Sequence, residues 1–199
     1  MARPREFETK DAIEGAMQVF WQHGYEEASL PDLLEGMGLT RGSLYKAFND
    51  KKNLFLLVLN HYETAAVDAG VALLTTTDIP DGRDRILAMF AGLFAAVSKG
   101  DHRGCLLCTA AAGPAADDPE IAEIVQKGLA KLQHGFEQAL SDTPALCDLS
   151  EVARLRLAGT LLTQYIGLRM LARSRLPLGI LEQSVQGVDQ ILSGAETAP

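Results

Sequence analysis

The 199-residue sequence contains few cysteines and no long hydrophobic run. Its three cysteines, an odd number, do not indicate the disulfide framework that small secreted domains use. No apolar stretch approaches the ~18–20 residues that a membrane-spanning helix needs. The charged N-terminus leads into no apolar segment of the kind that a secretory signal peptide contains. We therefore expect a cytoplasmic protein with no membrane partner.

The sequence is also short of positive charge. It has 18 Lys and Arg against 26 Asp and Glu, a net charge of −8, whereas proteins that bind nucleic acid need cations to neutralise phosphates. The balance is uneven, because residues 29–53 carry a net charge of +1 and most of the acidic excess lies from residue 63 onwards. Any contact with nucleic acid is therefore expected in the N-terminal part. Arg3 and Arg5 are either an arm that touches DNA or an ordinary solvated terminus.

Catalytic motifs are missing as well. The sequence has no glycine-rich phosphate loop, no Gly-x-Ser-x-Gly nucleophile elbow and no His-x-x-x-His pair. The acidic run at residues 117–120 resembles a hard-cation site, but acidic residues and a first-turn proline are also typical of a helix start, which explains the run better. We expect a protein that is not an enzyme and that holds neither a cofactor nor a metal.

Helical periodicity dominates what is present. Apolar residues recur every three or four positions along almost the whole chain, and no stretch alternates as a strand does. This pattern predicts an all-α fold of nine to ten helices in two lobes. The expected helices cover residues 8–23, with Gly24 as the stop, and residues 30–35, 41–48, 51–68, 83–99, 105–112, 119–140, 150–174 and 178–192. A polar stretch at residues 75–82 is expected to link the lobes.

The most informative segment is Ser29–Phe48, where a capped helix, a glycine turn and a second capped helix follow one another. This order predicts a helix-turn-helix, whose second helix enters the major groove of DNA. Its short polar side chains can reach base edges, and its Tyr and Lys can reach phosphates. The residues expected to bind DNA are Ser29, Thr40, Arg41, Gly42, Ser43, Tyr45, Lys46, Lys51 and Lys52. A hairpin that only packs would leave both caps and the outward polar residues unexplained.

Residues 7–55 resemble the TetR family of bacterial transcriptional regulators. The resemblance rests on residues 12–25, the Ser29 cap, Gly-Leu-Thr-Arg-Gly-Ser-Leu-Tyr-Lys-Ala-Phe at 38–48 and Asp-Lys-Lys-Asn-Leu-Phe at 50–55. Pro31 and Gly36 depart from the commonest family pattern, although neither removes a contact residue. The resemblance implies a DNA-binding domain at residues 1–55 and an effector-binding and dimerisation domain at residues 56–199. It also implies a double-stranded DNA operator as partner and a homodimer formed through residues 150–174 and 178–192.

Two cysteines are candidate sensors. Cys105 and Cys108 stand three residues apart, hence on one face of a helix if this segment is helical. Packed thiols, a redox or electrophile sensor and a metal-binding pair all stay open, although a structural zinc site would need a second pair of ligands. A Gly-Cys-Leu segment at this place recurs in one branch of the TetR family, some members of which sense oxidants or electrophiles.

An effector pocket is expected from weaker signals. Aromatic and methionine side chains suit an adaptable apolar cavity, and a few polar groups can orient a small-molecule effector. The candidates are Tyr62, Phe90, Phe94, Phe136, Gln164, Tyr165 and Arg169, together with Met89 and Met170. The predicted function is a repressor that a small-molecule or thiol-reactive signal releases from a palindromic operator. The alternatives are an interaction protein whose main partner is another protein, and a thiol enzyme that uses the cysteine pair.

Overall fold

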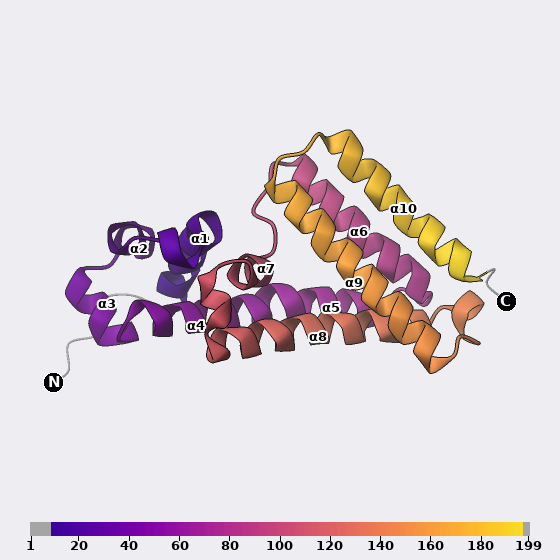
Figure 1. The fold of residues 1–199 in the computed structure, drawn as a ribbon, viewed down its shortest axis with the longest axis horizontal. Helices are drawn as coiled ribbons and strands as arrows, with labels where there is room; N and C mark the ends of the chain where they lie inside the picture. The colour runs from indigo at the N-terminus through magenta and orange to yellow at the C-terminus, as the bar shows by residue number, and fades with distance from the viewer. Residues whose placement is uncertain (1–8, 197–199) are drawn as a thin grey trace. The chain divides into compact units, whose positions relative to one another are not determined.

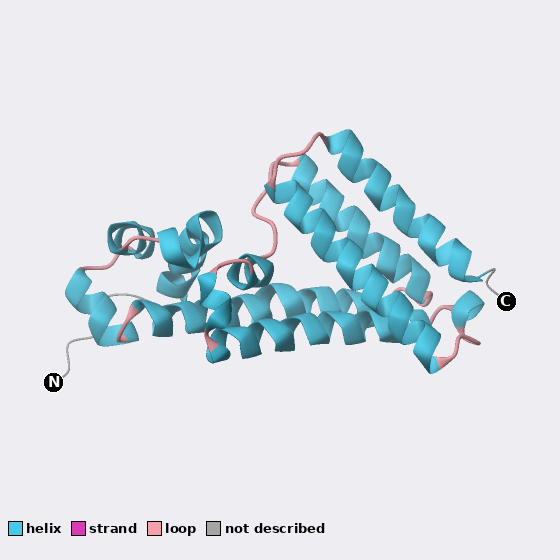
Figure 2. Cartoon of the chain, viewed as in Figure 1, coloured by secondary structure: helices cyan, strands magenta, loops and turns pink. Residues whose placement is uncertain are grey.

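The computed structural model describes residues Thr9–Glu196, so Arg3 and Arg5 lie outside the described residues. Within this range the chain is helical and has no strand, which confirms the predicted all-α fold (Figures 1 and 2). None of the helices in this range combines the length and the apolarity that a bilayer span requires. The described residues up to Ala65 form one compact unit with Leu106–Gln126, and Ala66–Cys105 form a second with the residues from Lys127 onwards.

The first unit holds the predicted helix-turn-helix. Its elements are α1 (Thr9–Glu27), α2 (Leu30–Met37), α3 (Arg41–Phe48), α4 (Lys51–Tyr62), α7 (Leu106–Ala111), the 3₁₀ turn η2 (Pro114–Asp117) and the first turns of α8 (Pro119–Ser141). Ser29, Thr40 and Asp50 accept hydrogen bonds from the backbone N–H of the third residue of α2, α3 and α4, respectively. The caps of α2 and α3 confirm the two capped helices predicted for Ser29–Phe48, and all three caps set where these helices begin.

Helix α1 extends beyond its predicted end at residue 23. Gly24 has a left-handed φ of +81° and interrupts the regular helix there, which glycine tolerates because it lacks Cβ. The chain then makes one more turn, to Glu27. This turn places the Tyr25 ring 4.8 Å from that of Phe55, measured between centroids, and so adds to the core.

Two glycines allow α1 and α2 to cross at backbone contact. A Cβ atom on Gly15 would lie 2.1 Å from the carbonyl oxygen of Gly36. A Cβ on Gly36 would lie 2.5 Å from Cγ2 of Val19. The departure of Gly36 from the commonest TetR pattern therefore has a structural reason, because this crossing leaves no room for a side chain at either position.

The second unit is a helical bundle. It consists of the π-turn residues 66–67, α5 (Asp68–Thr75), α6 (Gly82–Ser98), α8 from Lys127 onwards, the 3₁₀ turn η3 (Pro144–Leu146), α9 (Glu151–Arg173) and α10 (Leu178–Glu196). Buried Arg85, in the first turn of α6, links the C-terminal ends of α5 and α8, since its guanidinium donates to the Asp142 carboxylate at 2.8 Å and to the Leu74 carbonyl at 3.0 Å. Phe90, Phe136 and Tyr165 pack together in its core, with ring centroids 5.7–6.3 Å apart.

Several other predicted boundaries were wrong, among them the end of α2, which runs to Met37 and not to residue 35. The helix expected at 51–68 continues through the π-turn η1 (Glu63–Val67) into α5 and ends at Thr75, because no proline or turn sequence interrupts it earlier. Helix α7 starts at Leu106, so Cys105 precedes it. Helix α10 runs past its predicted end at residue 192 to Glu196.

The two compact units also do not follow the predicted domain boundary between residues 55 and 56. Helix α7 packs against α1 and α4, and η2 packs against α1, although the 40 residues 66–105 of the second unit intervene in the sequence. Buried Leu106, Leu107 and Ala115 supply apolar surface for these contacts. The assignment of separate functions to residues 1–55 and 56–199 stays a prediction.

Candidate nucleic-acid interface

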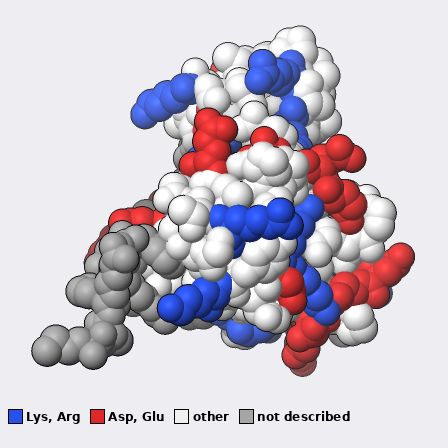
Figure 3. Space-filling view, turned by 90° about the vertical axis from the view of Figure 1, so that its left-hand side faces the viewer, with Lys and Arg blue, Asp and Glu red and all other residues white. Residues whose placement is uncertain are grey.

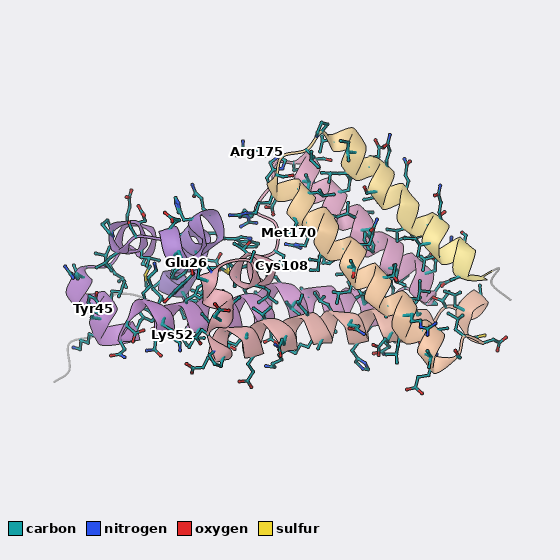
Figure 4. All side chains as sticks on the ribbon, viewed as in Figure 1. Glu26, Tyr45, Lys52, Cys108, Met170 and Arg175 are labelled. Carbon is teal, nitrogen blue, oxygen red and sulfur yellow. The ribbon has the colours of Figure 1, made fainter. Side chains whose placement is uncertain are left out.

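Helix α3 presents a polar face and buries an apolar one. Leu44 and Phe48 are buried in the first unit. Arg41 and Lys46 are exposed, and Tyr45 keeps 44% of its surface accessible. Figure 4 shows Tyr45 on α3. The Arg41 guanidinium lies 5.8 Å from the centre of the Tyr45 ring, a cation–π distance that gives the two side chains a joint orientation. The structure thus places the candidate DNA contacts on one side of a short helix.

Residues with small side chains, Thr40, Gly42 and Ser43, lie at the start of α3 beside this polar face. The Thr40 hydroxyl accepts from the Ser43 N–H at 3.3 Å and lies 3.0 Å from the Ser43 hydroxyl. Gly42 is exposed, and a Cβ there would meet no atom within 4 Å. Ser29 is elsewhere, at the start of α2. Its hydroxyl accepts from the Asp32 N–H at 3.3 Å, and the Asp32 carboxylate accepts from the Ser29 N–H at 3.2 Å, which closes a capping box. Its structural role is therefore to fix α2, which precedes the turn into α3.

The two lysines at the start of α4 contact groups of the protein itself. Lys51 Nζ donates to the Glu26 carbonyl at 3.2 Å and lies 4.9 Å from the centre of the Tyr25 ring. Burial lowers the pKa of Lys51. Lys52 Nζ lies 2.6 Å from a carboxylate oxygen of Asp118 and 2.6 Å from one of Glu120. Hydrogen bonds to these two carboxylates raise the pKa of Lys52.

Sequence reasoning preferred a helix start to a hard-cation site for Asp118 and Glu120. They do begin α8, because an oxygen of Asp118 accepts from the Glu120 N–H at 3.0 Å. Their partnership with Lys52 joins positions 66 and 68 residues apart in the sequence, and no local spacing signals it. Figure 3 shows one face of the molecule, on which Lys and Arg side chains form a band with acidic side chains beside it.

Comparison with known proteins identifies the family. The model of the bacterial regulatory proteins of the tetR family matches residues 12–58, which extend from α1 into α4. The HTH-type transcriptional repressor ComR of Escherichia coli K12 is 30% identical over 159 residues, which cover 76% of this chain and 75% of ComR. The chain belongs to the TetR family. It is a DNA-binding transcriptional regulator and not an enzyme.

Solved structures of TetR-family proteins share the whole fold. A cysteine-substituted variant of the TetR-family regulator CifR, bound to 26-base-pair operator DNA, is 29% identical with a TM-score of 0.78, over 92% of this chain and 98% of CifR. The reduced form of NemR from Escherichia coli has a TM-score of 0.77 at 22% identity, over 91% of this chain and 94% of NemR, and supports the fold. The TetR resemblance and the two-lobed all-α fold expected from the sequence are confirmed.

The predicted cysteine pair does not share a helix. Cys105 is buried in the loop before α7, whereas Cys108 is half-buried on α7. The loop that leads to Cys105 is bonded to α9: Arg169 donates to the Gly104 carbonyl at 2.7 and 3.2 Å, and Arg173 donates to the Arg103 carbonyl at 3.0 Å. Among residues 9–196, no three His, Cys, Asp or Glu side chains gather as a metal site would require.

A cavity of about 300 Å³ lies within the second unit. Most of its lining side chains are small or aliphatic, and one part is polar. The lining residues are Ala66, Ala69, Gly70, Leu73, Met89, Gly92, Leu93, Ala96, Val97, Asp101, Gly104, Tyr165, Arg169 and Ala172. In the polar part, Arg169 Nη1 donates to the Tyr165 hydroxyl at 2.9 Å. A hydrogen bond from Arg103 holds the pKa of Asp101 at about 2.

The structure brings only part of the predicted pocket set to this cavity. Tyr165, Arg169 and Met89 line it. Of the others, Phe90 and Phe136 are fully buried in the core, and Phe94 instead faces α10 residues such as Leu181. Gln164 and Met170 are half-buried on α9 and are not among the lining residues.

Tyr62 belongs to the core of the first unit and not to the cavity. Its ring packs edge-on against Trp21, with the centroids 5.0 Å apart. Sequence reasoning looked for large aromatic side chains and so missed the signal of the cavity, which is small residues at helical spacing. Ala66, Ala69 and Gly70, and likewise Gly92 and Ala96, leave room where larger side chains would fill the bundle.

Proposed function

We propose that the chain is a homodimeric repressor that binds a palindromic operator through α3 and leaves it when a signal reaches the second unit. The observation that carries this proposal is the exposed set Arg41, Tyr45 and Lys46 on a capped helix, in a chain that is 29% identical to an operator-bound TetR-family regulator. Thr40 and Ser43 suit base edges, whereas Tyr45 and Lys46 suit phosphate oxygens. Such a protein works in the cytoplasm, where bacterial DNA lies.

A homodimer through α9 and α10 is supported by exposed apolar side chains on these helices. The large ones are Val152, Leu155, Leu171, Leu178 and Ile180. Along α9, Gly159, Thr163 and Gly167 follow at four-residue spacing, and a Cβ on either glycine would meet no atom within 4 Å. An exposed apolar surface with small residues along it allows a second helix to approach closely. Two α3 helices could then occupy half-sites ~34–36 Å apart, or a multiple of that spacing.

One candidate signal is a small molecule in the cavity of the second unit. The apolar lining favours an apolar ligand body, and the volume of about 300 Å³ suits a small one. The polar part holds both a cation, Arg169, and an anion, Asp101, so we expect a neutral hydroxyl or carbonyl group there. A ligand acts as a signal if it binds the DNA-free conformation more tightly than the DNA-bound one.

The second candidate signal is modification of a thiol. Gly104 lines the cavity and Cys105 follows it, so a change at Cys105 would disturb the loop that Arg169 and Arg173 bind. The solved relatives include a cysteine-substituted CifR and a reduced NemR, which supports this candidate. Because Cys105 is buried, its reaction requires the loop to open, whereas half-buried Cys108 is more accessible.

Anisotropy of labelled DNA tests the proposal. The DNA upstream of the protein's own gene should bind tightly under reducing conditions, and a scrambled duplex weakly. Loss of binding after mild diamide treatment, reversed by dithiothreitol and absent from Cys105→Ser and Cys108→Ser, would support the thiol signal. Binding indifferent to diamide would favour a ligand in the cavity. Equal affinity for the scrambled duplex would contradict operator recognition and favour the alternative, an interaction protein that uses the apolar face of α9 and α10.

A further inference from the structure

Lys52 is held by two acidic groups of the first unit, Asp118 and Glu120. Its ammonium lies 2.6 Å from both the Asp118 and the Glu120 carboxylates, and 38% of its side-chain surface is still accessible (Figure 4). It stands in the first turn of α4, directly after the Asp50 cap. The N–H groups and the dipole of a helix start favour a phosphate there. A cation at this position would normally reinforce that preference.

The two carboxylates are positioned by the fold. One oxygen of Asp118 accepts from the Glu120 N–H at 3.0 Å, while its other oxygen faces Lys52. Just before it, the Ala115 N–H donates to the Glu26 carboxylate on α1 at 2.9 Å, and the Ala115 side chain is buried. The segment that carries the carboxylates is therefore docked on the DNA-binding helices by contacts of its own. The pairing with Lys52 is more constrained than a chance contact between two flexible surface chains.

We propose that Asp118 and Glu120 are positioning residues that withhold Lys52 from the DNA backbone. This inference rests on the proposed binding of DNA by α3 and the start of α4. A phosphate must compete with two carboxylates already at contact distance. While they hold Lys52, its charge is compensated within the protein, so it contributes little to the release of counterions from DNA.

This arrangement gives the regulator a built-in limit on its operator affinity. The carboxylates belong to the first turn of α8, and the same helix continues from Lys127 into the second unit. A change in α8 that separates Asp118 and Glu120 from Lys52 would add a phosphate contact. A change that strengthens the pairing of Lys52 with Asp118 and Glu120 would prevent Lys52 from contacting a phosphate.

The test is the salt dependence of operator binding by the Asp118→Asn/Glu120→Gln variant. Release of Lys52 should strengthen binding about fivefold at 0.15 M salt and steepen the plot of log K against log[salt] by about 0.9 per chain, hence by about 1.8 for a dimer on its operator. Asp117→Asn/Glu123→Gln is the matched control, because it removes two nearby exposed acidic groups that do not pair with Lys52. The control should change the slope much less.

Substitution of Lys52 completes a double-mutant cycle. Lys52→Ala should weaken operator binding more in the Asp118→Asn/Glu120→Gln variant than in the wild type, and it should abolish the gain of that variant. Should loss of the Asp118 cap impair folding, Glu120→Gln alone keeps the cap and should give part of the gain. A slope and an affinity unchanged from wild type in folded Glu120→Gln and in the double variant would overturn the proposal. Failure of DNA binding by α3 is distinguishable, since Arg41→Ala would then leave operator affinity unchanged.

Discussion

At the scale of single residues, the candidate DNA-binding site has two kinds of side chain. Some are exposed to solvent, and others already bond to groups of the protein. Lys46 is exposed on α3, whereas Lys51 and Lys52 contact groups of the protein itself. The sequence predicted the outward direction of Lys46 from helical spacing. It could not predict the partners of Lys52, because ion pairs across more than 60 residues depend on tertiary structure.

Lys46→Ala should weaken binding to operator and to scrambled DNA by similar factors. The physical reason is that a lysine–phosphate contact carries no sequence information. The slope of log K against log[salt] should become shallower by about 0.9 per chain, hence by about 1.8 for the dimer. Anisotropy titrations between 50 and 200 mM salt measure both quantities. An unchanged slope would show that Lys46 does not contact phosphate.

Arg103→Gln should reduce stability at neutral pH more than in acid. The bond from Arg103 holds the pKa of Asp101 at about 2, below the value of 3.8 expected without it. Because the folded-state pKa is the lower one, this interaction stabilises the fold fully above about pH 4 and loses its effect as the pH falls towards 2. Urea unfolding at pH 7 and pH 3 should show a larger difference between variant and wild type at pH 7. A larger difference at pH 3 would contradict this account.

At the scale of helices, local chemistry accounts for where the elements begin. Ser29, Thr40 and Asp50 are caps that need only the residues three positions ahead, so the starts of α2, α3 and α4 could be predicted. The π-turn η1 and the membership of α7 in the first unit could not, because they depend on packing between distant segments. The crossing of α1 and α2 through Gly15 and Gly36 was missed for the same reason.

Gly15→Ala should destabilise the DNA-binding unit by about 1–3 kcal/mol. Its Cβ would lie 2.1 Å from the backbone oxygen of Gly36, so the two helices must move apart. Gly42→Ala is the control, since its Cβ meets nothing within 4 Å and alanine favours a helix by about 1 kcal/mol. Thermal unfolding followed by circular dichroism compares them. Equal midpoints would show that the crossing is looser than the structure indicates.

At the scale of the whole molecule, the sequence predicts the fold and the family more readily than it predicts the effector cavity. The helix-turn-helix keeps a recognisable pattern because its caps, turn and contact face occupy one short segment. The cavity is lined by small residues on several helices. From the sequence alone, an alanine that lines a cavity cannot be distinguished from an alanine in a packed core. Tyr165 and Arg169 were found because they are polar groups on an otherwise apolar face.

Gly167→Leu should weaken the proposed dimer. A Cβ at this position meets nothing within 4 Å in the single chain, so the substitution should leave each chain folded while preventing close approach of a second α9. Ala130→Leu, on an exposed part of α8, is the control for added apolar surface. Sedimentation equilibrium should give a weaker dimer for the first variant only. Identical dissociation constants would place the interface elsewhere.

The most direct test of the central claim is the affinity of purified wild-type protein and its Arg41→Ala/Tyr45→Ala variant for the DNA upstream of the protein's own gene. If α3 recognises the operator, the wild type should bind with two chains per palindrome and at least ~10³-fold more tightly than scrambled DNA. The variant should retain its fold and its dimer but lose most of that preference. If the folded variant discriminates as well as the wild type, α3 is not the recognition helix.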